Sequence, residues 1–389
     1  MTEEKPFPAP QRDLFVFLEV FAGEGGIQSY VKDLLGAYRS LARGTDDRLL
    51  QAADVLILRD SPDCENPLDD RLAPPGKRVF NFTYLKTQPL WWGRMRLATV
   101  LLIQLLRSQP ARVFCGHINL APLVRFLCQP LGIPYIVLTY GKEVWTPLSP
   151  PYRRALNDAA CVWTIGRYSR DLACRSNEID PAKVRILPCA IDGSVFFPGA
   201  KPQHLLDLYG LGGAKVLMTV ARLWSGDIYK GVDVTIRALP TIAAAFPDVK
   251  YLVVGRGDDR PRLERLARDL GVADRVVFAG FVPTAELPDH YRVADAYIMP
   301  SQEGFGIVYL EAMATGIPVL SGDSDGSADP LQDGKLGWQV PHRDPQAVAA
   351  ACLEILQGDD LRCDGVWLRQ QTLEKFGKDA FVRRLGELL

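Results

Sequence analysis

Short apolar runs alternate with longer amphipathic segments along this 389-residue chain, and the alternation restarts midway. Apolar runs separated by helical patterns are typical of βαβ units, which build parallel sheets covered by helices. The fold class is therefore α/β, with two Rossmann-like, doubly wound parallel-sheet domains. The expected strands lie at 14–20, 54–59, 111–116, 134–140 and 161–166, and then at 214–222, 250–257, 275–281, 296–301 and 317–322.

A segment interrupted by proline and glycine, at 186–199, separates the two series. We expect a disordered lead-in over residues 1–12, an N-terminal domain over 13–190 and a C-terminal domain over 191–365. The remaining segment, 366–389, is predicted to be a helix that crosses back to the N-terminal domain. Because ligands of open α/β sheets bind at the carboxyl ends of the strands, a cleft between two such sheets is the expected site.

The composition is that of a soluble globular protein, with 48% hydrophobic and 23% charged residues. The longest apolar run, 98–106, has about half the length that a membrane span needs. The first residues lack the basic-then-apolar order of a signal peptide, and the eight cysteines form no CxxC pair. We therefore expect a cytoplasmic protein with free thiols.

Basic residues outnumber acidic ones in residues 1–190, and the reverse holds in the remainder. The imbalance is either ordinary scatter of charged residues, or it indicates that the basic half binds an anionic lipid or acceptor. Residues 83–106 place Trp91 and Trp92 with three basic residues beside an apolar helix. They form either an interfacial foot at the inner membrane face, for a lipid-linked acceptor, or a core helix whose start the tryptophans fix. No basic cluster or binding motif indicates a nucleic-acid partner.

A glycine-rich loop, FAGEGGIQSY, follows the first expected strand and opens a helix. Gly23, Gly25 and Gly26 would let the backbone approach a ligand, and the helix N-terminus favours an anion. The spacing is not that of the dinucleotide fingerprint, and no Walker A lysine follows. A tight strand-to-helix turn explains the same residues.

Two basic residues, Arg222 and Lys230, follow the first strand of the second series. Both would project from one loop at a carboxyl strand end, where a diphosphate could accept charge-assisted hydrogen bonds from them. The alternative is an ordinary solvated loop.

The stretch EGFGIVYLEA carries two acids eight positions apart, Glu303 and Glu311. The apolar pattern predicts a helix that begins near Gly306 and ends before a C′ glycine, Gly316. Glu303 then lies in the preceding loop and Glu311 on the second turn. The free amides of the first turn offer an anion site. These residues alone leave three interpretations open: a hydrolase acid/base pair, a nucleotide pocket, or a capped helix.

Few residues in the chain suggest a metal or a catalytic base. His117 follows the expected strand 111–116 at the edge of the cleft, where it acts on a ligand or closes a local hydrogen bond. No HxH, HExxH or clustered His/Cys/Asp set occurs, so we expect no metal. Asp323-Ser324-Asp325 could imitate a metal-binding DxD pair, but its Gly/Ser surroundings favour a turn.

Together these segments resemble the retaining family 4 glycosyltransferases of the GT-B fold. ARLWSGDIYKGVDVTIRALPTI, at 221–242, looks like that family's Arg…Lys-Gly phosphate loop. Residues 251–322 are similar to the family's core almost throughout, including its E-x7-E signature as Glu303 and Glu311. The similarity is close over about 214–345. In the first half it is limited to FAGEGGIQSY, CGHINL and TYGKEVW.

The resemblance implies a role for each matching residue. Arg222 and Lys230 would hold the donor diphosphate, Glu311 the ribose hydroxyls, and Glu303 the donor sugar. His117 matches the histidine near the reacting centre, so the implied catalytic residues are Glu303, His117, Lys230 and Arg222. The other implied donor contacts are Gly25, Gly26, Gly255, Phe281, Val282, Phe305, Gly306, Ile307 and Val308.

The activity that the resemblance implies is retaining transfer of a hexose from a UDP- or GDP-sugar. The acceptor would be a glycan, a lipid-linked molecule or a small molecule, as in polysaccharide or glycolipid biosynthesis. Neither a metal nor another cofactor is implied, and the leaving phosphate would act as base. The alternatives are a nucleotide-sugar 2-epimerase of the same fold and a non-catalytic nucleotide-sugar-binding protein. A dinucleotide oxidoreductase would need a fingerprint that the chain lacks.

The chain departs from the family pattern at three places. Many members have histidine where this chain has Tyr140. The interval from Arg222 to Lys230 is longer than the commonest form, through SGDIY. Relatives often read Gly-Gly-x-Pro-Glu where this chain reads Asp-Gly-Ser-Ala-Asp, at 325–329.

Overall fold

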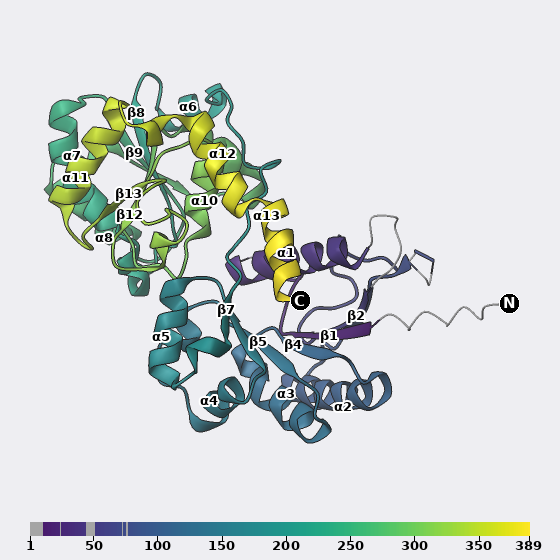
Figure 1. Ribbon diagram of the computed structural model, residues 1–389. Coiled ribbons are helices and arrows are strands. Elements are labelled where there is room, and N and C mark those ends of the chain that lie inside the picture. The colour runs from purple at the N-terminus through teal and green to yellow at the C-terminus, as the bar shows by residue number, and fades with distance from the viewer. Residues whose placement is uncertain (1–10, 24, 44–50, 72, 75–76) are drawn as a thin grey trace. The chain divides into compact units, whose positions relative to one another are not determined.

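The structure is a computed structural model that describes residues 11–23, 25–43, 51–71, 73–74 and 77–389. The chain divides into two compact units (Figure 1). The N-unit consists of Met1–Pro188 and Phe381–Leu389, and the C-unit of Cys189–Ala380. The first strand begins at Gln11, inside the expected lead-in, and the rest of that lead-in lies outside the described residues.

The N-unit is built on a seven-stranded sheet in the order β3-β2-β1-β4-β5-β6-β7. Neighbouring strands are parallel throughout. The strands are β1 (Gln11–Phe17), β2 (Gln51–Ile57), β3 (Phe80–Tyr84), β4 (Arg112–Cys115), β5 (Tyr135–Leu138), β6 (Cys161–Thr164) and β7 (Val184–Ile186).

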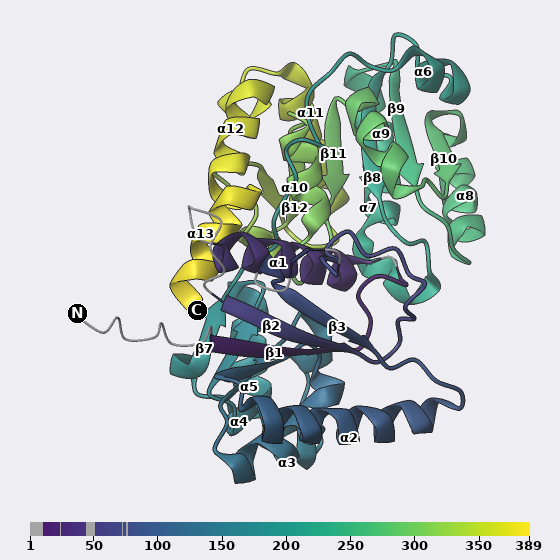
Figure 2. The same ribbon diagram turned by 90° about the vertical axis from the view of Figure 1, so that its right-hand side faces the viewer.

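Helices cover both faces of this sheet because successive strand side chains point to opposite sides. Leu14 and Val16 of β1 belong to a core that includes Leu97 and Leu101 of α2, whereas Phe15 lies 5.1 Å from the Tyr38 ring of α1. Figure 2 shows α1 on one face and α2 with α3 on the other. The helices are α1 (Gly26–Ala42), α2 (Leu90–Ser108), α3 (Ala121–Cys128), α4 (Pro150–Asn157) and α5 (Arg167–Asn177), with short 3₁₀ turns η2 (Ile118–Leu120), η3 (Gln129–Leu131), η4 (Lys142–Val144) and η5 (Pro181–Lys183).

The C-unit repeats this plan with a six-stranded parallel sheet in the order β10-β9-β8-β11-β12-β13. The central strands are apolar on both faces, as expected for a sheet covered on both sides. The strands are β8 (Lys215–Val220), β9 (Val249–Val254), β10 (Val276–Gly280), β11 (Ala296–Met299), β12 (Val319–Gly322) and β13 (Trp338–Val340).

In the C-unit, α7, α8 and α11 pack against one face of the sheet and α9, α10 and α12 against the other (Figures 1 and 2). The second face buries a layer of aromatic rings that includes Tyr291, Tyr297 and Tyr309. The helices are α6 (Gln203–Tyr209), α7 (Val232–Ala245), α8 (Arg260–Asp269), α9 (Leu287–Val293), α10 (Ile307–Ala314), α11 (Pro345–Gln357), α12 (Gly365–Phe376) and α13 (Lys378–Leu388), with 3₁₀ turns η6 (Ser225–Lys230), η7 (Ala273–Arg275), η8 (Thr284–Glu286), η9 (Gly326–Ala328) and η10 (Leu361–Cys363).

The predicted α/β class with two Rossmann-like parallel sheets is confirmed. The single helix expected near the C-terminus is wrong, because α12 ends at Phe376 and α13 begins at Lys378. A hydrogen bond from the Ile191 N–H to the Phe376 carbonyl, at 2.8 Å, fixes the break between them. From Phe381 onward α13 belongs to the N-unit, where the Phe381 ring lies 5.9 Å from that of Tyr30 in α1.

The tryptophan pair near the start of α2 does not fix a core helix. Trp91 and Trp92 lie in the first turn of α2, their rings stack on each other at 4.8 Å, and they are 56% and 52% exposed. The core-helix interpretation of these rings is therefore wrong. Across the residues that the structure covers, no helix is both long enough and apolar enough to cross a bilayer.

Candidate active site

A glycine lies on each side of the helix α10, as the sequence predicts. Gly306 has φ 86°, and a Cβ there would lie 2.5 Å from the Tyr309 ring, so only glycine fits. Gly316, with φ 81°, follows the last turn as a C′ residue. The first amides of α10 therefore stand at the carboxyl edge of β11.

Glu303, in the loop between β11 and α10, forms an ion pair with Lys230. Lys230 is the last residue of η6, in the loop after β8. The two side chains are 16% and 19% exposed. Two residues singled out separately in the sequence are thus direct partners at adjacent strand ends, since β8 pairs with β11.

Asp325 holds the loop of Glu303 through hydrogen bonds. One oxygen of its carboxylate accepts the Glu303 N–H, and the other accepts the N–H and the hydroxyl of Ser327. Gly326 donates its N–H to the Glu303 carbonyl at 2.8 Å, and a Cβ on Gly326 would lie 2.0 Å from the Gly304 oxygen. Burial raises the pKa of Asp325 to about 6. The sequence pattern did not indicate this clamp, because it placed Asp325 only in a turn.

Glu311 has a different partner from Glu303. Its carboxylate accepts a hydrogen bond of 2.7 Å from the hydroxyl of Tyr291, a buried residue of α9. Desolvation raises the pKa of Glu311 to about 7, against the lowering effect of the Tyr291 hydrogen bond. A further hydrogen bond from a ligand hydroxyl would stabilise the charged form of this buried carboxylate.

Arg222 lies two residues beyond β8 with its side chain 73% exposed. Its guanidinium forms an ion pair of 2.7 Å with the buried Asp227 and lies 6.0 Å from the Trp224 ring. Arg222, Asp227 and Lys230 line one small cavity. The loop therefore presents both predicted cations around the same hollow.

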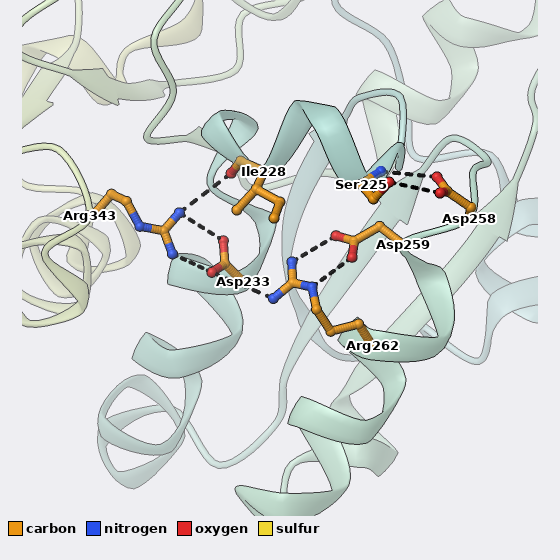
Figure 3. A network of polar contacts seen from close by, with 7 residues as sticks. All are labelled: Ser225, Ile228, Asp233, Asp258, Asp259, Arg262 and Arg343. Carbon is orange, nitrogen blue, oxygen red and sulfur yellow. Dashed lines mark hydrogen bonds and ion pairs between the residues drawn. The ribbon is translucent and has the colours of Figure 1, made fainter.

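The additional residues of this loop, SGDIY, are held in place by the neighbouring segments (Figure 3). Ser225 donates its N–H and its hydroxyl to Asp258, at 2.9 and 2.8 Å. The Ile228 carbonyl accepts a bond of 3.4 Å from Arg343. The longer spacing between Arg222 and Lys230 thus forms an anchored 3₁₀ segment.

A second part of the same network fixes the start of α7 (Figure 3). Asp233 is buried and pairs with Arg343 and, at 3.9 Å, with Arg262. Arg262 also makes two hydrogen bonds to Asp259, at 2.6 and 2.7 Å. The two guanidiniums offset the cost of burying the Asp233 charge. Because Asp233 lies in the first turn of α7, these ion pairs hold the start of that helix.

The residues expected near a nucleotide base lie beyond β9 and β10. A Cβ on Gly255 would lie 1.8 Å from the Ala221 carbonyl oxygen, so packing alone requires glycine there. Phe281 is 55% exposed, and the Arg256 guanidinium lies 4.7 Å from its ring centroid. The side chain of Val282 is buried, so this residue could contact a ligand only through its backbone.

The predicted contacts around α10 differ in what they expose. The ring of Phe305 is buried and lies 5.9 Å from that of Phe376, so this residue can offer only its backbone. Ile307 and Val308 are half-buried at the first turn of α10. Their amides, with that of Gly306, stay predicted anion donors.

Gly25, Gly26 and His117 belong to the N-unit. Gly25 caps α1, and its carbonyl accepts the Ser29 N–H at 3.0 Å. A Cβ on Gly26 would meet no atom within 4 Å. Packing within the structure therefore does not require glycine at position 26.

His117 makes the local hydrogen bond that the sequence left as an alternative to a ligand contact. Its Nδ1 accepts the Asn119 N–H at 3.1 Å. Burial lowers the pKa of His117, with a further lowering from Arg59 and an opposing effect of Glu143. The imidazole is thus favoured as neutral, with Nδ1 as acceptor and the proton on Nε2.

Tyr140 occupies the position where many relatives have histidine, and it is a core residue. Its hydroxyl donates to the Gly116 carbonyl at 2.8 Å, and its N–H donates to the Glu143 carboxylate. The ring is buried and lies 5.6 Å from that of Tyr30. Tyr140 therefore supports the residue preceding His117.

The stretch 323–325 forms a bend that leads into η9, with Asp325 as its cap. Asp323 accepts the Ser324 hydroxyl at 2.8 Å. In the described part of the chain, no group of three or more His, Cys, Asp or Glu side chains is arranged to hold a metal ion.

Family models and known relatives match most of the chain. Residues 25–190 match a glycosyl transferase 4-like domain, and residues 214–358 match the glycosyl transferases group 1. A GDP-mannose-dependent alpha-(1-6)-phosphatidylinositol monomannoside mannosyltransferase of Mycolicibacterium smegmatis is 32% identical over 385 residues, with 94% of each chain covered. A D-inositol 3-phosphate glycosyltransferase of Acidothermus cellulolyticus is 33% identical, over 85% of this chain and 78% of its own.

A solved structure supports the fold. Anabaena Alr3699/HepE in complex with UDP superposes with a TM-score of 0.73 at 17% identity, over 97% of this chain and 99% of that chain. The family models match most of the chain, two relatives align along most of their length, and the E-x7-E loop is paired to Lys230. These observations together show the family. This chain is a glycosyltransferase and belongs to family 4, with the GT-B fold.

Proposed function

We propose that this protein transfers mannose from GDP-mannose to a lipid-linked acceptor, with retention of the anomeric configuration and without a metal ion. The observation that carries the proposal is the Glu303–Lys230 ion pair beside the first turn of α10. The choice of GDP-mannose rests on the Mycolicibacterium smegmatis relative, which aligns over 94% of the chain and is named for that donor.

The cations would act on the leaving group. When the anomeric C–O bond breaks, negative charge develops on the nucleoside diphosphate. Lys230, Arg222 and the amides at the start of α10 are fixed positive groups that lower the energy of that charge. Lys230 would exchange part of its interaction with Glu303 for the phosphate.

The two acids would bind hydroxyl groups. Glu311 would accept hydrogen bonds from the ribose, and Glu303 from the mannose, whose ring it would orient. A double displacement needs a carboxylate below the anomeric carbon. Because Glu303 is engaged with Lys230, we assign it to positioning. The acceptor hydroxyl would attack from the face of the leaving phosphate, which would take its proton.

The test compares nucleotide-sugars on the purified protein. GDP-mannose is expected to raise the melting temperature more than GDP-glucose, UDP-glucose or ADP-glucose, and to be hydrolysed slowly without acceptor. Lys230→Ala should abolish both effects, whereas Lys335→Ala, at an exposed lysine of the same unit, should leave them intact. Preference for a UDP-sugar would overturn the donor, and unchanged hydrolysis by Lys230→Ala would overturn the site. A 2-epimerase would instead release the epimerised free sugar.

The acceptor assignment draws on the outer face of α2. Trp91, Trp92 and Met95 are more than half exposed, and Leu106 continues this face. The helix carries three arginines and no acid in LWWGRMRLATVLLIQLLRS. An exposed apolar face flanked only by positive charge fits the surface of an anionic bilayer. We therefore assign this face to peripheral contact with the inner membrane face.

Sedimentation with liposomes tests that contact. The wild-type protein is expected to pellet with phosphatidylglycerol-containing vesicles and not with phosphatidylcholine vesicles, and high salt should weaken the binding. The double variant Trp91→Ala/Trp92→Ala should remain in the supernatant. Equal pelleting of this variant and the wild type would rule out α2 as the contact.

A further inference from the structure

A cavity of about 730 Å³ opens at the carboxyl edge of the N-unit sheet. Its walls come from the segments after β1, β2, β3 and β4, from the first turns of α2, and from Leu123 of α3 and Tyr152 of α4. The carboxyl edge is where open parallel sheets bind their ligands. Every residue around this cavity belongs to the N-unit.

Three cations from separate elements surround the cavity. Arg59 follows β2, Lys86 follows β3 and Arg94 lies on α2. All three are exposed, and no ion pair joins any of them to an acid in the described ranges. Among the residues that the structure describes, no aspartate or glutamate lines the cavity. Such a set of uncompensated cations favours an anion, and a phosphate can accept hydrogen bonds from each of them.

The cavity also adjoins the loop of His117. Asn119 lines it, and the N–H of Asn119 donates to the Nδ1 of His117. Arg59 is close enough to lower the pKa of His117 by its charge. A molecule bound among the cations would therefore extend toward the residue that the family resemblance places near the reacting centre.

A second cavity, of about 550 Å³, continues the first along α2 and has a different character. The two share Thr87, Gln88 and Met95. The second is lined mainly by apolar groups, including those of Trp92 and Val100. A charged hollow thus adjoins a mainly apolar groove, whose lining includes the exposed Trp92 and one further cation, Arg96.

We propose that the two adjoining cavities form the acceptor site, and that they take an amphiphile with a phosphate between its polar head and its hydrocarbon chain. The phosphate would lie among Arg59, Lys86 and Arg94, and the chain would follow the groove over Met95 toward Trp92. The sugar-accepting hydroxyl would lie at the Asn119 end. This proposal rests on the proposed function and names the acceptor class for that same reaction.

The experiment uses two acceptors that share the phosphate and differ in the chain: phosphatidylinositol in vesicles and soluble inositol 1-phosphate. Arg59→Ala and Arg94→Ala should raise the KM for both acceptors about tenfold or more. Thr99→Trp, which fills the apolar groove, should raise the KM for the lipid and leave that for inositol phosphate within twofold. Arg107→Ala, at an exposed arginine of α2 outside both cavities, is the matched control with the soluble acceptor.

Donor hydrolysis without acceptor and the melting-temperature shift with GDP-mannose are measured for every variant. Both should stay at wild-type values in Arg94→Ala, Thr99→Trp and Arg107→Ala, because none of these residues is among the implied donor contacts. Arg59→Ala is assessed by its acceptor KM alone, because the Arg59 charge acts on His117. Unchanged acceptor KM in both arginine variants would overturn the phosphate site. An equal effect of Thr99→Trp on both acceptors would overturn the groove. A wild-type protein that hydrolyses GDP-mannose but glycosylates neither acceptor would overturn the acceptor class and leave the donor assignment standing.

Discussion

Lys230 and Glu303, 73 residues apart in the sequence, neutralise each other at adjacent strand ends of the C-unit. Each side chain is less than one fifth exposed, so removing one leaves the other poorly solvated and unpaired. In the proposed reaction Lys230 binds the donor phosphate, and Glu303 binds the hydroxyl groups of the donor sugar.

Lys230→Ala and Glu303→Ala should each lower kcat by about 10²- to 10³-fold, the range for loss of one fixed group that stabilises a transition state. Because the two residues act through one contact, the double variant should lose less than the product of the single effects. The measurement is a double-variant cycle on kcat with the proposed donor. Additive losses would show that the residues act independently.

Donor affinity should depend on the ionisation of Glu311. Burial raises the pKa of this carboxyl to about 7, and a ribose hydroxyl donates to the ionised form. Affinity should therefore rise as the pH rises through 7, with proton release on binding below that pH. Calorimetry with GDP-mannose in buffers of different ionisation enthalpy measures the proton. Glu311→Gln should bind weakly without pH dependence, and Tyr291→Phe should move the transition to higher pH. Proton uptake would contradict the assignment.

Asp325 should affect donor binding through the position of Glu303. Asp325→Ala removes the acceptor of two backbone amides, those of Glu303 and Ser327, and should cost about 1–3 kcal/mol of stability. The KM for the donor should rise, because the Glu303 loop loses its clamp. The exposed Asp323 gives the matched control: Asp323→Ala should change neither quantity.

The pH dependence of stability gives Asp325 a second readout. Its pKa is about 6 in the folded protein against the ordinary 3.8, so the folded state binds this proton more tightly. The associated stability is present below pH 4 and is lost as the pH rises through 6, at most about 3 kcal/mol. The melting temperature of Asp325→Asn should therefore vary less than that of the wild type between pH 4 and 6. Parallel profiles would contradict the raised pKa.

Tyr140→Phe should affect stability more than activity. The change leaves the buried Gly116 carbonyl without the hydroxyl that it accepts, at a cost of about 1–2 kcal/mol. The tyrosine ring lies in the core, so the donor KM should stay within about twofold. Thermal unfolding and steady-state kinetics on the same preparation distinguish an effect on stability from an effect on activity. A large fall in kcat with an unchanged melting temperature would show that Tyr140 acts on the sugar.

Gly26→Ala tests whether a ligand requires the glycine. An added Cβ meets no atom within 4 Å, so the melting temperature should be unchanged. If the backbone approaches the donor diphosphate, the donor KM should rise about tenfold. Gly36→Ala, in the same helix and with equal space around it, should stabilise slightly and leave the KM alone. Equal kinetics in both variants would remove Gly26 from the site.

Much of the fold could be predicted because strong local patterns match the tertiary environment. The run AKVLMTVAR contains β8, which lies at the centre of a sheet buried on both faces. Gly306 precedes α10 and Gly316 follows it, as expected. The strands missed were β3, β7 and β13. In β3 only the first residue is buried, so the strand lacks an apolar run. β7 and β13 have three residues each, and β7 contains the exposed Arg185.

The sequence identified candidate residues for the site but not the contacts between them. Glu303 and Lys230 were identified separately, but their pairing depends on β8 lying beside β11. The clamp by Asp325 depends on the close approach of two loops 22 residues apart. The two environments possible for Trp91 have the same sequence pattern, so only the three-dimensional structure distinguishes them.

The ring of Phe305 has a mechanical consequence for the donor loop. It packs on Phe376, whose carbonyl accepts the Ile191 N–H, so the two covalent tethers of the C-unit, at Cys189 and Ala380, run close to a shared anchor point. The loop that carries Glu303 is therefore packed, through one aromatic pair, against the first and last segments of the C-unit. A substitution that removes either ring would loosen the loop and these two segments together.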